Sequence, residues 1–424
     1  MNAPVVPAAL ERAVWFEASL RKIAGRELKS GNRLTLLLDG PQAHEAQLRA
    51  IANAQHHVHL ETYLLTDDDL GTRYGEVLQQ RARAGVKVRL MLDGLGASGA
   101  GDEYRDALRE AGVELREFNS INPFKNPRVW RMTRRSHRKT LIVDGRVAFT
   151  GGVNITDEYR RSPDDPTPAV GSERGWRDTQ VMLEGPAVAE FQQMFLMYWA
   201  RLGALRDEDG CYCSEPIADA QARVCAITDQ GEDFVDHLIT DAPPSHLMQL
   251  RPKYRVEPRI YHAYLSAIRL ARERIWITQA YFAPNGRLIR ALAAAARRGL
   301  DVRLLLPGAS DVPLVHYAGR RRYARLLKAG VRIWEYQQAM LHAKTAVIDG
   351  VWATVGSANL DYRSLFHNDE ANAFIVDASF AQELERVFEH DLRHAGEIRL
   401  AQWKRRGWFD RLMELFAGSI KRLL

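Results

Sequence analysis

The stretch HRKTLIVDGRVAFTGGVN, residues 137–154, occurs a second time in the chain as HAKTAVIDGVWATVGSAN, residues 342–359. Three further pairs of segments repeat in the same order: HLETYLL with WITQAYF, VKVRLMLDG with LDVRLLLPG, and AGVELREF with AGVRIWEY. Four matches in one order indicate an internal duplication rather than chance similarity. The repeat therefore predicts two similar lobes, related by a pseudo-twofold axis, with a functional site at their interface.

Each repeat alternates short apolar runs with helical patterns. The runs VRLMLD, KTLIVDG and RLLLP are typical of buried strands, and LIRALAAAARRG, from Leu288, predicts a helix that ends at Gly299. Strands that alternate with helices indicate the α/β class. We expect each lobe to be a mixed, mostly parallel sheet flanked by helices.

The domain boundaries follow from the extent of the repeat. We expect a first lobe over residues 1–206, a polar connector over 207–218, a second lobe over 219–400 and a basic amphipathic helix over 401–424. Residues 229–257 have no counterpart in the first repeat, and the sequence assigns them no role.

Composition narrows the class of protein. The 424 residues suffice for two domains, and 59 Lys and Arg against 53 Asp and Glu give a net charge of only +6. The three cysteines, Cys211, Cys213 and Cys225, are too few for a disulfide framework and suit a reducing compartment. We find neither a signal peptide nor an apolar run long enough to span a bilayer, so we expect any membrane contact to be peripheral.

The pattern His-x-Lys-x4-Asp occurs once in each repeat. Its members, the candidate catalytic residues, are His137, Lys139, Asp144, His342, Lys344 and Asp349. Side chains two apart on a strand share a face, so each histidine is expected beside a permanent cation, an arrangement that suits a phosphate. A core histidine and a partly buried lysine would explain one copy equally well; two copies at matching places favour catalysis. The turns TGGVN and VGSAN add backbone donors and the side chains of Asn154 and Asn359.

The duplicated motif resembles the signature of the phospholipase D superfamily. The resemblance extends to GGVN after the first copy, to GSANLD after the second and to AYFAP before the second, and it covers most of residues 33–400. Within the superfamily the chain is similar to bacterial cardiolipin synthases of the shorter type, which lack N-terminal membrane helices. This resemblance implies two phospholipase D-like lobes whose histidines meet at the interface. One histidine attacks phosphorus, and the other serves as general acid and then as general base.

The resemblance also implies roles for individual residues. It implies His137 as the nucleophile and His342 as the acid, and the denser basic surroundings of His137 favour the neutral imidazole that attack requires. An acid that follows each motif orients the histidine: Glu370 for His342 and, beyond an extra polar loop, Asp178 for His137, with Glu173 as a rival.

The remaining charged residues are expected to play other parts. Asp144 and Asp349 should brace the turn after each strand rather than touch the substrate. The two lysines and two asparagines would stabilise the nonbridging phosphoryl oxygens, so we expect no metal and no other cofactor. We expect the run Asp67–Asp69 to be a solvated loop rather than a metal cluster.

Two surface features bear on the substrate. Residues 125–139 carry seven basic side chains and no acid, and 320–322 are three arginines; such clusters occur on solvated faces, anionic headgroup interfaces and nucleic-acid sites.

The tail WKRRGWFDRLMELFAGSIKRLL, from Trp403, places its aromatic and aliphatic side chains on one broad helical face. A basic amphipathic helix of this kind is typical of a membrane-surface anchor, and a helix packed on its own domain is the equally weighted alternative.

These features support one main function and two alternatives. The main hypothesis is transfer of a phosphatidyl group from one phosphatidylglycerol to another, which yields cardiolipin and glycerol. Hydrolysis of phospholipid or nucleic acid by the same histidines is the second hypothesis. A phosphate-binding module without turnover is the third, and two intact motifs argue against it. We expect phosphatidylglycerol, other anionic phospholipids and a membrane surface as partners, and no nucleic acid. The expected location is peripheral, on the cytoplasmic side of the bacterial inner membrane; the sequence does not indicate the oligomeric state.

Overall fold

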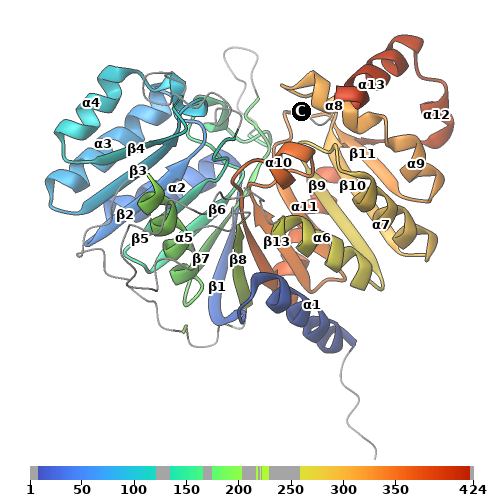
Figure 1. Ribbon diagram of the computed structural model, residues 1–424, viewed down its shortest axis with the longest axis horizontal. Coiled ribbons are helices and arrows are strands. Elements are labelled where there is room, and N and C mark those ends of the chain that lie inside the picture. The colour runs from blue at the N-terminus through green and yellow to red at the C-terminus, as the bar shows by residue number, and fades with distance from the viewer. Residues whose placement is uncertain are drawn as a thin grey trace, which may run out of the picture.

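Two lobes lie side by side and share one continuous β-sheet (Figure 1). The computed structural model describes residues 8–120, 134–165, 174–202, 216–217, 220, 222–228 and 258–420. Most of the expected connector, the segment 229–257, Cys211 and Cys213 lie outside the described residues. No helix within the described ranges is long and apolar enough to cross a bilayer.

The described residues of the first half of the chain form seven strands. Its elements are α1 (Ala8–Ala24), β1 (Lys29–Leu38), α2 (Asp39–Ala52), β2 (His57–Thr62), α3 (Asp69–Arg83), β3 (Lys87–Asp93), α4 (Asp102–Glu110), β4 (Glu114–Phe118), β5 (Thr140–Val143), β6 (Val147–Gly151), β7 (Thr179–Glu184) and α5 (Val188–Arg201), with single 3-10 turns at Gly96–Gly99 and Asp157–Tyr159.

The second half repeats this order and extends it. Its elements are β8 (Ala222–Thr228), α6 (Arg259–Leu270), β9 (Arg274–Gln279), α7 (Gly286–Arg297), β10 (Asp301–Pro307), α8 (Pro313–Arg320), α9 (Tyr323–Lys328), β11 (Arg332–Tyr336), β12 (Lys344–Ile348), β13 (Trp352–Gly356), α10 (Tyr362–Phe366), β14 (Ala371–Val376), α11 (Ala378–Leu392), β15 (Ala395–Glu397), α12 (Leu400–Lys404) and α13 (Trp408–Ile420).

The sheet order confirms the duplication. From the middle outward, the first lobe runs β1-β7-β6-β5-β2-β3-β4 and the second runs β8-β14-β13-β12-β9-β10-β11, with β15 added at its edge. The antiparallel pair β1–β8 joins the two halves. Equivalent strands therefore lie at equal places on either side of the junction, as a pseudo-twofold pair requires.

The sheet is mixed, but less parallel than the sequence predicted. Only β2–β3–β4 and β9–β10–β11 pair in parallel, and the remaining neighbours are antiparallel. The continuous apolar runs suggested parallel pairing. A strand has such a sequence whenever both faces of its sheet are covered, whether its neighbours are parallel or antiparallel. In β5, Leu141 and Val143 face the core under α2, α3 and α4, whereas Ile142 faces the core under α5.

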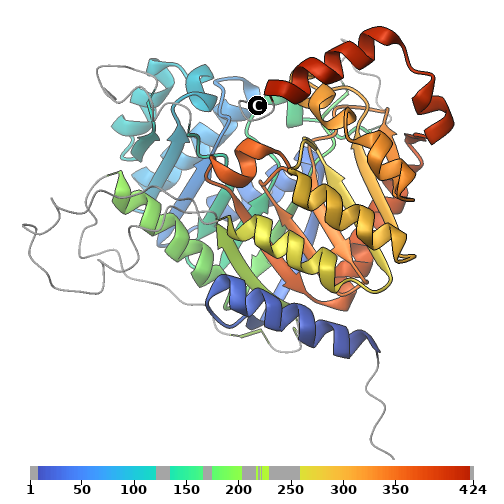
Figure 2. The same cartoon turned by 45° about the vertical axis from the view of Figure 1, so that its right-hand side comes forward.

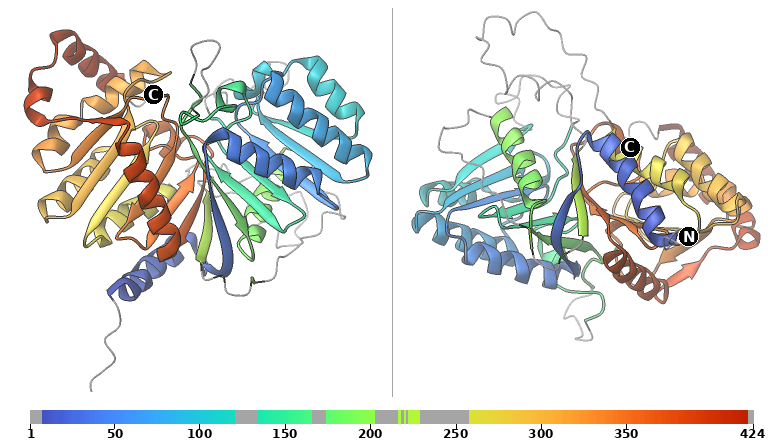
Figure 3. Two further views of the ribbon diagram at one scale, coloured as in Figure 1. Left: turned by 180° about the vertical axis from the view of Figure 1, so that it is seen from behind. Right: turned by 90° about the horizontal axis from the view of Figure 1, so that it is seen from below.

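Helices cover both faces of each lobe (Figure 3). In the second lobe α6, α7 and α9 pack on one face, and α11 packs on the other. Helix α1 belongs to the expected first lobe, residues 1–206, but it packs against α6 of the second lobe (Figure 2). In this contact Ser19 Oγ lies 2.6 Å from Ser266 Oγ. The helix predicted from Leu288 is α7, and Gly299 follows it with a φ of +93°, a conformation that favours glycine.

Candidate active site

The two motif histidines enter the lobe interface through matching backbone contacts. His137 precedes β5, and its N–H donates to the carbonyl of Asp369, in the second lobe, at 2.9 Å. His342 precedes β12, and its N–H donates to the carbonyl of Arg177, in the first lobe, at 2.8 Å. Short parallel bridges, Ser136 with Asp369 and Arg177 with Leu341, fix both crossings. Each histidine is therefore held beside a segment of the opposite lobe.

These crossings decide which acid meets which histidine. His137 Nδ1 lies 3.1 Å from Glu370 Oε2, and His342 Nδ1 lies 2.8 Å from Asp178 Oδ2. Both acids predicted from the sequence contact a motif histidine, but the predicted pairing is wrong, because each acid was assigned to the motif of its own repeat. Glu370 and Asp178 each directly follow the residue that bridges to the other lobe, so they reach across the interface. The rival Glu173 lies outside the described residues.

Glu370 is fully buried and held by two hydroxyl groups. Ser357 Oγ donates to its Oε2 and Ser364 Oγ to its Oε1, each at 2.5 Å. Although burial alone would raise the pKa of Glu370, the charge and hydrogen bond of His137, the charge of Lys139 and the Ser357 hydroxyl lower it below its usual value. Glu370 is therefore held as the carboxylate. Burial and the neighbouring Lys139 charge lower the pKa of His137.

The second pair has different surroundings. Asp178 packs against Gly152, where a Cβ atom would collide with its carboxylate, and it accepts a hydrogen bond from its neighbour Thr179 N at 2.7 Å. Burial raises the pKa of Asp178 to about 6. His342 Nδ1 also lies 2.7 Å from the hydroxyl of the buried Tyr159. Burial and the charges of the two motif lysines hold the pKa of His342 well below its usual value.

The two lysines give the site its positive charge. Lys139 Nζ donates to the carbonyl of His137 at 2.8 Å, and Lys344 Nζ donates in the same way to the carbonyl of His342. Burial and mutual repulsion lower the pKa of Lys139 to about 7, and burial lowers that of Lys344 to about 8. An anion that enters the site would favour the protonated form of both lysines.

The motif aspartates occupy structural positions, as expected. Asp144 accepts backbone hydrogen bonds from Gln55, His56 and His57 at 2.7–2.8 Å. Asp349 accepts the equivalent three from residues 272–274 at 2.8–2.9 Å. Both have a positive φ, +52° and +53°, which aspartate tolerates in a turn. Asp144 joins the turn after β5 to the start of β2, and Asp349 joins the turn after β12 to the start of β9. Neither side chain contacts the motif histidines His137 and His342.

The two asparagines differ. Asn154 Oδ1 accepts from Leu64 N at 3.3 Å, and its Nδ2 donates to the Tyr159 hydroxyl at 3.2 Å, so both ends of this amide serve the protein itself. The Oδ1 atom of Asn359 is buried and has no partner among the described residues. This oxygen of Asn359 can accept a hydrogen bond from a ligand hydroxyl, whereas an anionic oxygen would need the Nδ2 group of the same amide as donor.

The basic run before the first motif is only partly a surface feature. Arg134 pairs with Asp369, Arg135 with Asp93 and Arg138 with Glu61. Arg135 and Arg138 are almost fully buried and pair within the first lobe, whereas Arg134 pairs across the lobe interface, so these three charges are neutralised inside the protein rather than presented as a headgroup patch. Lys125, Arg128 and Arg131 lie outside the described residues.

The acidic run Asp67–Asp69 has structural uses. Asp68 caps α3 by accepting from Gly71 N at 2.9 Å, and Asp69 pairs with Arg160 at the surface. One group of three potential metal ligands occurs among the described residues, and it includes neither His137 nor His342.

Sequence reasoning missed three side chains that complete the site, Tyr159, Ser357 and Ser364. Tyr159 and Ser364 each stand five residues after the asparagine of their turn, so they occupy equivalent positions of the repeat. Ser357 lies within the quoted VGSAN turn, opposite Gly152 of the first repeat. A comparison of the positions at which the repeats differ could have found all three.

Comparison with known proteins agrees with this geometry. The family model described as "Cardiolipin synthase, PLD-like domain" matches residues 48–165 and 264–392. A cardiolipin synthase of Halalkalibacterium halodurans is 33% identical over 404 residues, which cover 95% of this chain and 74% of the relative. A cardiolipin synthase of Geobacillus kaustophilus is 34% identical over 407 residues, with the same coverage.

A solved structure of similar fold is the phosphatidylserine synthase of Haemophilus influenzae. It superimposes with a TM-score of 0.67 over 97% of this chain and 100% of the other. Because the two sequences are only 13% identical, the match shows a similar fold and nothing more. The family match and the sequence relatives extend over both lobes and both histidine motifs. The chain therefore belongs to the bacterial cardiolipin synthases, the phosphatidyltransferases built from phospholipase D-like domains.

Proposed function

We propose that this chain joins two phosphatidylglycerol molecules through a covalent phosphohistidine and releases glycerol. The observation that carries the proposal is a crossed pair of half-sites, each made of one motif histidine and the carboxylate of the other lobe that contacts it. Two histidines enter one interface, each with Nδ1 held by a carboxylate of the other lobe, and two buried lysines accompany them. With Nδ1 occupied, Nε2 of each ring is left for chemistry.

The first step breaks the bond between phosphorus and the glycerol headgroup. His137 Nε2 attacks phosphorus, and a P–N bond replaces the P–O bond to the glycerol oxygen. Glu370 stabilises the positive charge that develops on the attacking imidazole. The phosphodiester anion raises the pKa of His342 as it binds, and the protonated ring then donates its proton to the leaving glycerol oxygen.

The second step reverses this chemistry with a new alcohol. His342, now neutral, takes the proton from a glycerol hydroxyl of the second phosphatidylglycerol. That oxygen attacks phosphorus, the P–N bond breaks, and His137 is free again. Lys139, Lys344 and the Nδ2 donor of Asn359 stabilise the nonbridging oxygens in both steps, so we expect turnover to persist in the presence of a chelator.

The decisive experiment incubates purified protein with phosphatidylglycerol vesicles in EDTA and identifies the products by lipid mass spectrometry. We expect cardiolipin and glycerol in equal amounts. Phosphatidic acid as the main product would mean that water replaces the second lipid and that the chain is a hydrolase. Loss of all products in EDTA, restored by a divalent cation, would refute the metal-independent mechanism.

We further propose that α13 attaches the enzyme to the anionic inner face of the bacterial membrane. Five of the nine large apolar side chains that are exposed in the described residues lie on this helix: Trp408, Phe409, Leu412, Leu415 and Phe416. Helix α13 packs on α8 (Figure 2). The buried Ala417, on the opposite face of α13, lies in this contact. The helix therefore both packs on its own lobe and presents an apolar face to the surroundings.

The position of α13 favours a lipid surface as the occupant of this face. Ala417 belongs to a small apolar cluster against which Tyr281 packs, and the Tyr281 ring lies 6.2 Å from the ring of His342. The exposed Lys404, Arg405 and Arg411 lie on or just before the helix and would each gain roughly 1 kcal/mol at an anionic surface. A membrane bound here would bring its headgroups to the edge of the active site.

A triple variant tests the attachment: Phe409→Ser, Leu412→Ser and Phe416→Ser. We expect weaker sedimentation with phosphatidylglycerol vesicles and lower activity on them, with unchanged activity on a soluble short-chain phosphatidylglycerol. Leu95→Ser, which also removes an exposed apolar side chain, is the matched control and should change neither. Unchanged vesicle binding, or a switch from dimer to monomer by light scattering, would show that the face serves another purpose.

A further inference from the structure

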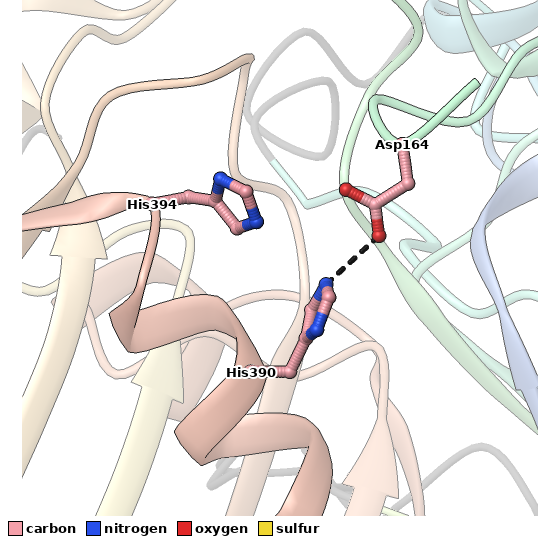
Figure 4. A group of neighbouring side chains, drawn as sticks. All are labelled: Asp164, His390 and His394. Carbon is pink, nitrogen blue, oxygen red and sulfur yellow. Dashed lines mark hydrogen bonds and ion pairs between the residues drawn. The ribbon is translucent and has the colours of Figure 1, made fainter. Parts of the chain in front are cut away.

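Three potential metal ligands from the two lobes meet at the end of α11 (Figure 4). His390 lies in the last turn of α11, His394 lies just beyond the helix, and Asp164 comes from the first lobe. Their ligand atoms all lie within 4.8 Å of one another, and His390 Nε2 is 2.9 Å from Asp164 Oδ2. All three side chains are accessible to solvent.

The surrounding contacts hold the three side chains in place. Gln338 Nε2 donates to the carbonyl of Pro163 at 2.8 Å and to Asp164 Oδ1 at 3.3 Å, which fixes the first-lobe loop on the second lobe. The backbone carbonyl of His394 accepts from Gln337 N at 3.0 Å. Two imidazoles and one carboxylate are the ligand set that suits Zn²⁺ and related divalent ions, and solvent can supply a fourth ligand.

The structure assigns to Asp164, His390 and His394 a binding site for a divalent transition metal of the zinc class, which clasps the two lobes together. This site is independent of the proposed transferase mechanism, since none of the three residues contacts either motif histidine. Binding requires His390 to carry its proton on Nδ1 and its lone pair on Nε2. Arg393, which lies 3.3 Å from His390 Nδ1, must then turn away.

The proposed metal site, the clasp, is connected to Tyr159 and Asp178, the two side chains that contact His342 Nδ1. Asp164 follows Tyr159 by five residues, on a loop that leads directly from the tyrosine. Asp391, next to His390, forms two hydrogen bonds of 2.9 Å with Arg177, the residue before Asp178. A metal at the clasp would thus tie together the two chain segments that carry Tyr159 and Asp178.

Titration of the full chain with Co²⁺ tests this site, after removal of any affinity tag and of bound metal. We expect one equivalent of Co²⁺ to bind with a visible absorption band that Zn²⁺ abolishes, and Zn²⁺ to raise the melting temperature. His390→Gln, His394→Gln and Asp164→Asn should each weaken binding by about tenfold or more, because each removes a ligand. Arg393→Ala should tighten it, because a competing positive charge is lost.

Controls make the result decisive. His262→Gln, which alters an exposed histidine elsewhere, should bind Co²⁺ as the unmodified protein does. Equal melting temperatures of all variants in EDTA would show that the fold is intact. The proposal is overturned if the unmodified protein binds no Co²⁺, or if its affinity is the same in all three ligand variants. Activity on phosphatidylglycerol in EDTA reports separately on the transferase mechanism.

Discussion

The two half-sites have the same backbone frame and different chemistry. In one, two serine hydroxyls hold Glu370 against His137, and the pKa of the carboxyl group is lowered. In the other, Asp178 packs on a glycine, its pKa is raised to about 6, and a tyrosine hydroxyl shares the histidine Nδ1. The duplicated backbone is the same in both half-sites, but two equivalent positions differ. Gly152 in the first repeat corresponds to Ser357 in the second, and Tyr159 corresponds to Ser364.

This difference suits a division of labour. A nucleophilic imidazole gains a positive charge as it attacks, and a carboxylate that stays ionised stabilises that charge throughout. A general acid that later becomes a base must gain and lose a proton during turnover, which suits a pair in which burial raises the pKa of the carboxyl group to about 6. We therefore propose that His137 is the nucleophile and His342 the acid and base. The pairing of Glu370 with His342 that the sequence analysis expected is wrong, and the crossed pairing adds a separate reason for these roles.

Removal of either imidazole should have the largest effect. We expect His137→Ala and His342→Ala each to lower kcat by at least about 10²-fold, with His262→Ala unchanged as the control. A phosphatidyl ester of p-nitrophenol, whose leaving group needs no proton, separates the roles. The His342 variant should release one equivalent of p-nitrophenol in a burst and then stall, and the His137 variant should show no burst. The opposite pattern would reverse the roles.

Neutral replacements of the two carboxylates should have the next largest effect. We expect Glu370→Gln to lower kcat by roughly 10- to 100-fold, because it removes the charge that balances the attacking imidazole. Asp178→Asn should lower the rate of the burst step less than the rate of the second step, in which His342 must accept a proton. Glu385→Gln, which breaks a salt bridge with Arg274 away from the site, is the control. Equal losses in both steps for the two variants would remove the proposed difference between the half-sites.

The pH dependence should expose the two lysines. The protonated forms bind the phosphodiester anion, and the pKa values of Lys139 and Lys344 are about 7 and about 8. We therefore expect kcat/KM, which reports on the free enzyme, to fall as pH rises through this range. The fall in kcat should come at higher pH, because the bound anion raises both pKa values. A kcat/KM that stays level to about pH 10, near the usual pKa of lysine, would contradict this account.

Tyr159→Phe should have the smallest effect. Tyr159 is a positioning residue, and loss of one hydrogen bond to His342 should lower kcat about fivefold, with KM unchanged. The same change should shift the pH profile of kcat, which a purely structural defect would not do. Tyr74→Phe, which removes another buried hydroxyl, bonded to His44 and Gln47, is the matched control. A shift of equal size in both variants would mean that the tyrosine acts through stability alone.

The sequence was sufficient for the parts of the site that repeat. The duplicated motif predicted the two lobes and the structural use of Asp144 and Asp349, because these depend on the repeat and on local strand and turn patterns. The meeting of the histidines was implied by the family resemblance. The sequence could not predict the crossed pairing, since this depends on the bridges that Ser136 and Leu341 make with the opposite lobe. It also missed Tyr159, Ser357 and Ser364. A comparison of the repeats could have singled out these positions, but their contacts with a histidine–carboxylate pair form only when the two lobes meet.

Mapping of the phosphoenzyme tests the central claim most directly. Purified enzyme is mixed rapidly with phosphatidylglycerol labelled in its phosphate, quenched in alkali to preserve phosphohistidine, digested and analysed by mass spectrometry. The account predicts that the label lies on the peptide that contains His137 in the unmodified protein, and that it accumulates in His342→Ala with the p-nitrophenyl substrate. Label on His342 alone in the unmodified protein would contradict it.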